Sequence, residues 1–307
     1  MRRSAYFPDY SGYGFVNLVA SLVEACGGTP RHPPLVSLPV AEIRCAGNVV
    51  FLIVDGLGDN YLEAHGQGGQ ITRHRRGASR MVSWRKIINS RYNAYHCGRA
   101  ERLAYDNLAG FVEQTVNAVK SGPRHKFVYA YWPAFDTLAH RYGVASAQVR
   151  AHFAALDAAF GELLSRLAGS DTLLVLTADH GFIDSPPEES LELPPALSAM
   201  LRFPLCGERR VAFCHVQDQK AFLEKAKSLL ENRSDVRPSQ ELLDEGWFGS
   251  GRAHPRFAER IGEVALVMTG RGTVKDWVCG ESRHLHIGNH GGMSEDEMKI
   301  PLVVAQA

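Results

Sequence analysis

The segment Leu173-Leu174-Val175-Leu176-Thr177-Ala178-Asp179-His180-Gly181 is an apolar run that ends in two adjacent metal-ligand side chains and a glycine. An aspartate and a histidine are costly to hold at the end of a buried strand unless something binds them. Residues 48–54 form a second apolar run, and both runs are nearly continuous rather than alternating, which is typical of parallel strands covered by helices on both faces. We therefore expect an α/β fold with a mainly parallel central sheet.

The sequence around these runs predicts further elements of the same fold. Residues 147–167 carry apolar side chains at helical spacing and lie between a predicted strand at 127–132 and the run at 172–178, which indicates a right-handed β-α-β unit. Residues 16–26 also have helical spacing. A last strand is expected at 300–305, where Pro301 favours the start of the strand or an edge position.

The length of 307 residues suits one large α/β domain over 1–307. After Pro186-Pro187 the pattern changes to short strands, one helix and glycine-rich turns. We interpret residues 186–285 as an inserted, smaller α+β region of that domain.

Composition excludes several classes of function. The net charge of +1 gives no global field for nucleic acid or an anionic membrane surface. No apolar stretch is long enough for a membrane span, which needs about 20 residues. The six cysteines are scattered without a disulfide-dense pattern, so we expect reduced thiols and a cytoplasmic protein. The sequence leaves the oligomeric state open.

Three further segments carry potential metal ligands. Asp55 follows the run at 48–54, Asp136 and His140 stand four residues apart on a predicted helix, and His290 precedes two glycines. Each alone has an ordinary explanation as a turn residue or an exposed helical pair. With Asp179 and His180 they supply three carboxylates and three imidazoles, several of them at the carboxyl ends of strands, where ligands collect in open α/β sheets.

Six such ligands divide naturally into two sites of three, which leaves room for water or substrate at each metal. Two divalent ions can stabilise the attacking and the leaving oxygen of a displacement at phosphorus. The ligand set suits zinc, although manganese and iron also accept it.

In this order, Asp55-Gly56, Asp136-x-x-x-His140, Thr177-Ala178-Asp179-His180-Gly181 and His290-Gly291-Gly292 resemble the alkaline phosphatase superfamily, most closely its type I phosphodiesterase/nucleotide pyrophosphatase branch. The resemblance covers most of residues 45–305. It implies one zinc held by Asp136, His140 and His290 and another held by Asp55, Asp179 and His180. It also implies hydrolysis of a small phosphate ester or nucleotide, in which a Thr or Ser alkoxide attacks phosphorus and water then hydrolyses the covalent phospho- or nucleotidyl-enzyme.

The chain departs from the family pattern where the nucleophile is expected. Only 80 residues separate Asp55 from Asp136, and no small-residue turn with a suitable hydroxyl stands between them. We infer that the nucleophile-bearing segment near 70–90 is shortened or missing. Ser79 and Ser90 are the nearest candidates, but neither has the expected neighbours.

Three interpretations follow from this departure. The chain is a metal-dependent phosphodiesterase-like hydrolase, or a metal-binding but catalytically impaired member that lacks the nucleophile segment. A sulfatase-type or phosphomutase-type relative is disfavoured, since no cysteine here stands in the C/S-x-P-x-R context that sulfatases require.

Overall fold

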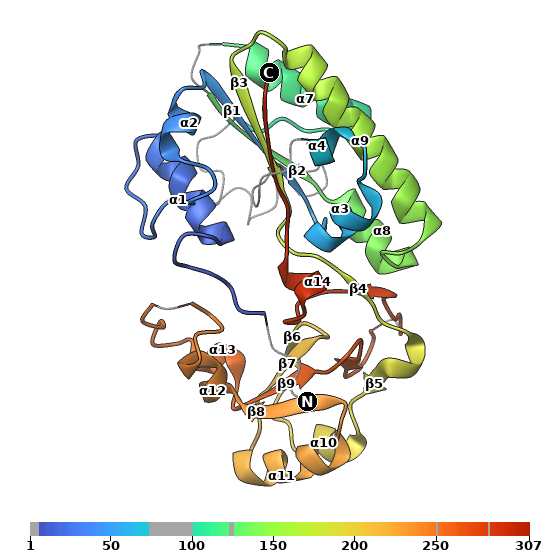
Figure 1. The fold of residues 1–307 in the computed structure, drawn as a ribbon. Coiled ribbons are helices and arrows are strands. Elements are labelled where there is room, and N and C mark those ends of the chain that lie inside the picture. Colours follow the sequence, from blue (N-terminus) through green and yellow to red (C-terminus); the bar gives the residue numbers. More distant parts are fainter. Residues whose placement is uncertain (1–5, 74–100, 123–125, 250, 282) are drawn as a thin grey trace. The chain divides into compact units, whose positions relative to one another are not determined.

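The computed structural model of the chain describes residues 6–73, 101–122, 126–249, 251–281 and 283–307 (Figure 1). The described residues belong to two compact units. The first, here called the core unit, lies within Asp9–Leu138, Ser146–Gly181 and Lys299–Ala307, and the second unit comprises residues 6–8, Ala139–Ala145 and Phe182–Met298. Helix α8 (Ala134–Tyr142) is continuous through the point where the chain passes from one unit to the other.

The core unit is built on a four-stranded sheet with the order β12-β3-β1-β2. Its strands are β1 (Asn48–Val54), β2 (Lys126–Trp132), β3 (Thr172–Thr177) and β12 (Leu302–Gln306). Strand β1 pairs in parallel with β2 and β3, and β12 pairs with β3 in the antiparallel sense. The prediction of a mainly parallel central sheet is therefore confirmed, and all residues of β1 and β3 are buried.

Helices cover both faces of this sheet (Figure 1). On one face α1 (Phe15–Ala25) and α2 (Val40–Arg44) pack against β1, β3 and β12 through an apolar cluster that includes Leu22, Ile43 and Phe51. On the other face lie α7 (Leu108–Lys120) and α9 (Ala147–Leu167). The short helices α3 (Asp59–His65) and α4 (Gln70–Arg73) follow β1.

Helix α9 has the bounds that its apolar spacing predicts. Its buried side chains recur every three or four residues from Val149 to Leu167. The helix begins after Ser146, whose hydroxyl accepts a hydrogen bond from the amide of Val149 and so satisfies one of the first-turn donors. Although α9 has 21 residues, none of the described helices is both long and apolar enough to cross a membrane.

The second unit contains a four-stranded antiparallel sheet with the order β6-β7-β9-β8. Its strands are β6 (Cys206–Gly207), β7 (Val211–Cys214), β8 (Ser234–Pro238) and β9 (Val264–Met268). Two small sheets pair β5 (Ser190–Glu192) with β10 (Thr273–Lys275) and β4 (Ile183–Asp184) with β11 (Gly288–Asn289). The helices are the 3-10 helix Pro187–Glu189, α10 (Pro195–Ser198), α11 (Gln219–Leu229), α12 (Ser239–Asp244), α13 (Ala258–Ile261) and α14 (Glu295–Met298).

The expected insertion at 186–285 falls inside the Phe182–Met298 segment of this second unit. The unit has an apolar core of its own, in which Phe222 of α11 packs with Cys214 of β7 and Leu266 of β9. The observed β7, α11 and β9 are short strands and a helix of the kind that the sequence pattern indicates for 186–285.

Candidate metal centre

Three of the candidate ligands follow the carboxyl ends of neighbouring parallel strands. Asp55 comes directly after β1, and Asp179 and His180 come shortly after β3. The amide of Asp55 donates a hydrogen bond to the carbonyl oxygen of Trp132 at the end of β2 (3.0 Å), and the amide of Gly56 donates to Oδ1 of Asp179 (3.2 Å). These bonds fix the three strand ends relative to one another, as expected for ligands at one edge of a parallel sheet.

Asp55, Asp136 and His180 form one group of potential metal ligands, all within the core unit. Each offers one ligand atom, and these atoms lie within 4.8 Å of one another. Nδ1 of His180 lies 3.1 Å from the carbonyl oxygen of Gly181, which can only accept, so that contact places the ring hydrogen on Nδ1. Nε2, which lies 3.4 Å from Oδ1 of Asp55, is then the nitrogen suited to a metal.

The neighbouring carboxylates perturb the pKa of His180. Burial lowers this pKa, but the hydrogen bond to Asp55 and the charges of Asp179 and Asp55 outweigh burial and raise the pKa to about 9. Burial also raises the pKa of Asp179 to about 6, against the attraction of the positive charge on His180. A space that holds several carboxylates in this way favours a cation, and a divalent metal would take the place of the proton on His180.

Tyr131 of β2 is a further polar side chain of this group. Its hydroxyl donates a hydrogen bond to Oδ2 of Asp55. Burial and the charge of Asp55 raise the pKa of Tyr131, so the phenol keeps its proton and acts as a donor. The sequence motifs do not identify this residue. The strand register does, because Tyr131 pairs with Ile53, which lies two residues before Asp55 and therefore on the same face of β1.

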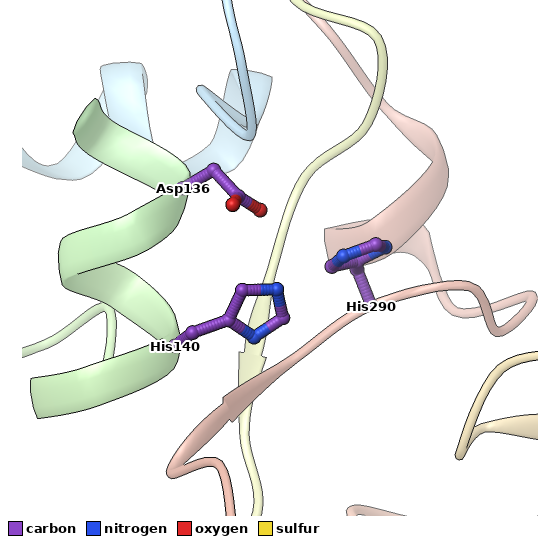
Figure 2. Close-up of side chains that lie close together, drawn as sticks. All are labelled: Asp136, His140 and His290. Carbon is purple, nitrogen blue, oxygen red and sulfur yellow. The ribbon is translucent and has the colours of Figure 1, made fainter. Parts of the chain in front are cut away.

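Asp136, His140 and His290 form the second group. Asp136 and His140 lie one turn apart on α8 and project from the same side of that helix, while His290 follows β11 (Figure 2). Their ligand atoms also lie within 4.8 Å of one another. Nδ1 of His140 lies 2.9 Å from the carbonyl oxygen of Gly288, so its hydrogen belongs on Nδ1 and Nε2 carries the lone pair that a metal binds. The ring of Phe182 packs edge-on against both imidazoles.

The structure brings five of the six predicted ligands into these two groups, and Asp136 belongs to both. Asp179 lies just beside the first group. Its Oδ1 accepts hydrogen bonds from the amides of Gly56 and His180 and is 3.9 Å from Nε2 of His180. In the described part of the chain, Asp136 is the residue whose ligand atom groups with those of Asp55 and His180. The candidate nucleophiles Ser79 and Ser90 lie outside the described residues.

His286 is a second residue that the motifs do not identify. Its ring centroid lies 4.3 Å from that of His140 and 5.5 Å from that of His284. Burial lowers the pKa of His286 to about 4, and the positive charges of His140, Arg209 and His284 act in the same direction. The imidazole of His286 is therefore neutral near neutral pH. The pair of histidines in His284-x-His286 was the available sequence signal.

Comparisons with known proteins identify a family and a fold for this chain. Residues 70–291 match the family model described as type I phosphodiesterase/nucleotide pyrophosphatase. No curated protein matches the chain. Among solved structures, murine ectonucleotide pyrophosphatase/phosphodiesterase 5 is similar, both alone and as an inactive variant in complex with AMP. In each case the identity is 14%, the alignment covers 84% of this chain and 87% of the murine chain, and the TM-score is 0.57. This likeness shows that the fold is alkaline phosphatase-like.

Proposed function

This chain belongs to the type I phosphodiesterase/nucleotide pyrophosphatase family, and on that premise we propose that it hydrolyses phosphate esters at a dinuclear metal site. The observation that carries the proposal is the pair of ligand groups that share Asp136. Family membership alone makes the chain a phosphodiesterase-type hydrolase. The two groups support the proposal of two metals held by these residues.

The side chains of both groups suit divalent metals. The first offers two carboxylates and one imidazole, and the second offers one carboxylate and two imidazoles. Zinc accepts oxygen and imidazole ligands alike, and a site with three protein ligands keeps a position for substrate. Two zinc ions would polarise the phosphoryl group and stabilise the attacking and leaving oxygens.

The residues around the ligands have defined supporting roles in this proposal. The hydroxyl of Tyr131 holds one oxygen of Asp55, and the carbonyl of Gly288 sets the orientation of the ring of His140. Such contacts fix the orientation and protonation of metal ligands. Oδ1 of Asp179 lies 3.9 Å from Nε2 of His180. Asp179 is therefore close enough to join Asp55 and His180 as a ligand of the first metal, as the family resemblance implies.

We propose a nucleotide or another small phosphate ester as the substrate. The proposal is supported by the similar murine structure, which is in complex with AMP. The covalent mechanism implied by the family needs a hydroxyl nucleophile, for which Ser79 and Ser90 remain the candidates from sequence.

The test is turnover by the zinc-loaded chain of bis-p-nitrophenyl phosphate and of p-nitrophenyl phosphate, with the metal content measured on the same samples. We expect diesterase activity that Asp136→Asn abolishes. The matched control is Asp235→Asn, the same substitution at an exposed position of β8, which should leave turnover unchanged.

Two outcomes would contradict the proposal in different ways. Two bound metals without turnover would refute hydrolysis and identify a metal-binding, catalytically impaired family member. The absence of bound metal would refute both interpretations.

A further inference from the structure

After His290, the backbone at Gly291 and Gly292 passes close to the buried carboxylate of Glu297. A Cβ atom on Gly292 would lie 2.6 Å from Oε1 of Glu297, closer than Cβ atoms come to other atoms unless a neighbour shifts. The amide of Gly292 donates a hydrogen bond to the same oxygen at 2.8 Å. Gly291 has a φ of +90°, in the left-handed region that favours glycine. The His-Gly-Gly motif is thus the sequence of a turn that wraps around Glu297.

The other oxygen of Glu297 holds the next part of the same turn. Oε2 accepts hydrogen bonds from the hydroxyl of Ser294 at 2.5 Å and from the amide of Ser294 at 3.4 Å. Ser294 and Glu297 have the spacing of a capping box at the start of α14. One carboxylate therefore fixes the backbone two and four residues after His290.

Arg210 anchors this carboxylate to the second unit. Its guanidinium binds Glu297 in a bidentate manner, with Nε to Oε1 at 3.0 Å and Nη2 to Oε2 at 3.2 Å. It also donates to the carbonyl oxygens of Gly270 and Gly272. The two side chains are only 3% and 1% exposed. Since Arg210 directly precedes β7, the ion pair connects the His290 turn to the four-stranded sheet.

The residues just before His290 are also held in place by hydrogen bonds. Nδ2 of Asn289 donates to the carbonyl oxygens of His286 (3.1 Å) and Ile287 (3.3 Å). Strand β11 pairs with β4, and the carbonyl oxygen of Gly288 contacts the ring of His140. His290 is therefore fixed on both sides, by β11 before it and by Glu297 after it.

We propose that the buried Glu297–Arg210 pair is a positioning device that holds His290 in place as a metal ligand beside His140. The inference rests on the proposed function, because that function makes His290 a ligand. Stability alone is a weak explanation for the pair, since replacing a buried ion pair with apolar side chains is often neutral or stabilising. Apolar side chains would not, however, supply the oxygens that accept hydrogen bonds from the amides of Gly292 and Ser294.

Two matched double variants separate positioning from stability. Arg210→Met with Glu297→Gln removes both charges but keeps one side-chain oxygen, which can still accept from the amide of Gly292, while the new amide nitrogen can donate to the hydroxyl of Ser294. Arg210→Met with Glu297→Met removes the charges and the acceptors. We expect the Gln variant to bind zinc like the wild type. The Met variant should bind one of its two zinc ions about 10- to 100-fold more weakly, as substitutions of residues that support metal ligands typically do.

Hydrogen exchange of residues 290–294 in the metal-free proteins supplies a readout that does not depend on zinc. Exchange should accelerate in the Met variant and stay near the wild-type rate in the Gln variant. Equal exchange and equal zinc affinity in the two variants would overturn the inference. A wild-type chain that binds no zinc would instead refute the proposed function, and the exchange rates would still decide whether Glu297 fixes the turn.

Discussion

Because the pKa of His180 is raised in the folded chain, we expect the stability of the metal-free chain to depend on pH. The folded chain holds the proton on His180 with a pKa of about 9, against an ordinary value of 6.5 in the unfolded chain. A raised pKa means that the folded state binds the proton more tightly. The stabilisation is therefore fully present below pH 6.5 and is lost as the pH rises through about 9.

The magnitude follows from the two pKa values. Their difference corresponds to about 3 kcal/mol of unfolding free energy, since one pKa unit is worth about 1.4 kcal/mol. The titration of Asp179 changes the unfolding free energy at lower pH than that of His180. The pKa of Asp179 is raised from 3.8 to about 6, so its contribution is lost as the pH rises through that range and is nearly constant above it. Above about pH 6.5 the titration of His180 therefore dominates the pH dependence of stability within this group.

The assay is denaturant unfolding of the chelator-treated chain and of His180→Asn, at about pH 6.5 and about pH 10. Titrations that do not depend on His180 cancel in the difference between the two unfolding free energies. That difference should fall by about 3 kcal/mol across the window. A difference that stays constant, or that grows with pH, would refute the reasoning that the carboxylates of Asp55 and Asp179 hold a proton on His180.

Three other predictions concern the ligands and their support. Tyr131→Phe removes a donor to the buried carboxylate of Asp55, and denaturant unfolding should show a loss of about 1.5–3 kcal/mol; no loss would mean that water replaces the hydroxyl. Asp136→Asn should abolish binding of both zinc ions whereas His290→Asn should abolish one, and equal losses by metal analysis would argue against a shared Asp136. Chelation should lower the melting temperature, because zinc at a free concentration of about 100 times its Kd stabilises the folded state by about 2.7 kcal/mol; an unchanged melting curve would contradict an occupied site.

The fold could be predicted closely where one local pattern determines an element. The run at 48–54 and the helix at 147–167 have the bounds that the sequence indicates, because continuous burial and helical spacing are local properties. The last strand was expected at 300–305 and is found as β12, Leu302–Gln306. Its apolar run indicates burial but not direction, so the antiparallel pairing with β3 could not be foreseen.

The candidate site was predictable to the extent that its ligands lie next to the ends of strands or on one helix face. Asp55 and Asp136 are recognisable in this way. Tyr131 is not, because it reaches Asp55 only through the register of two strands that are distant in sequence. The pair of Arg210 and Glu297 is separated by 87 residues, and nothing local to either residue indicates the partner.

A proton and a metal ion would compete for Nε2 of His180 in the proposed site. The carboxylates of Asp55 and Asp179 raise the pKa of His180, so near neutral pH the metal-free chain keeps a proton where a zinc ligand is needed. A zinc ion bound here would have to displace that proton, so its binding would weaken at low pH and strengthen as the pH approaches about 9. The same carboxylates thus attract the metal and also retain the proton that opposes it. Near neutral pH, a proton or a metal ion on His180 would therefore offset the negative charges of Asp55 and Asp179.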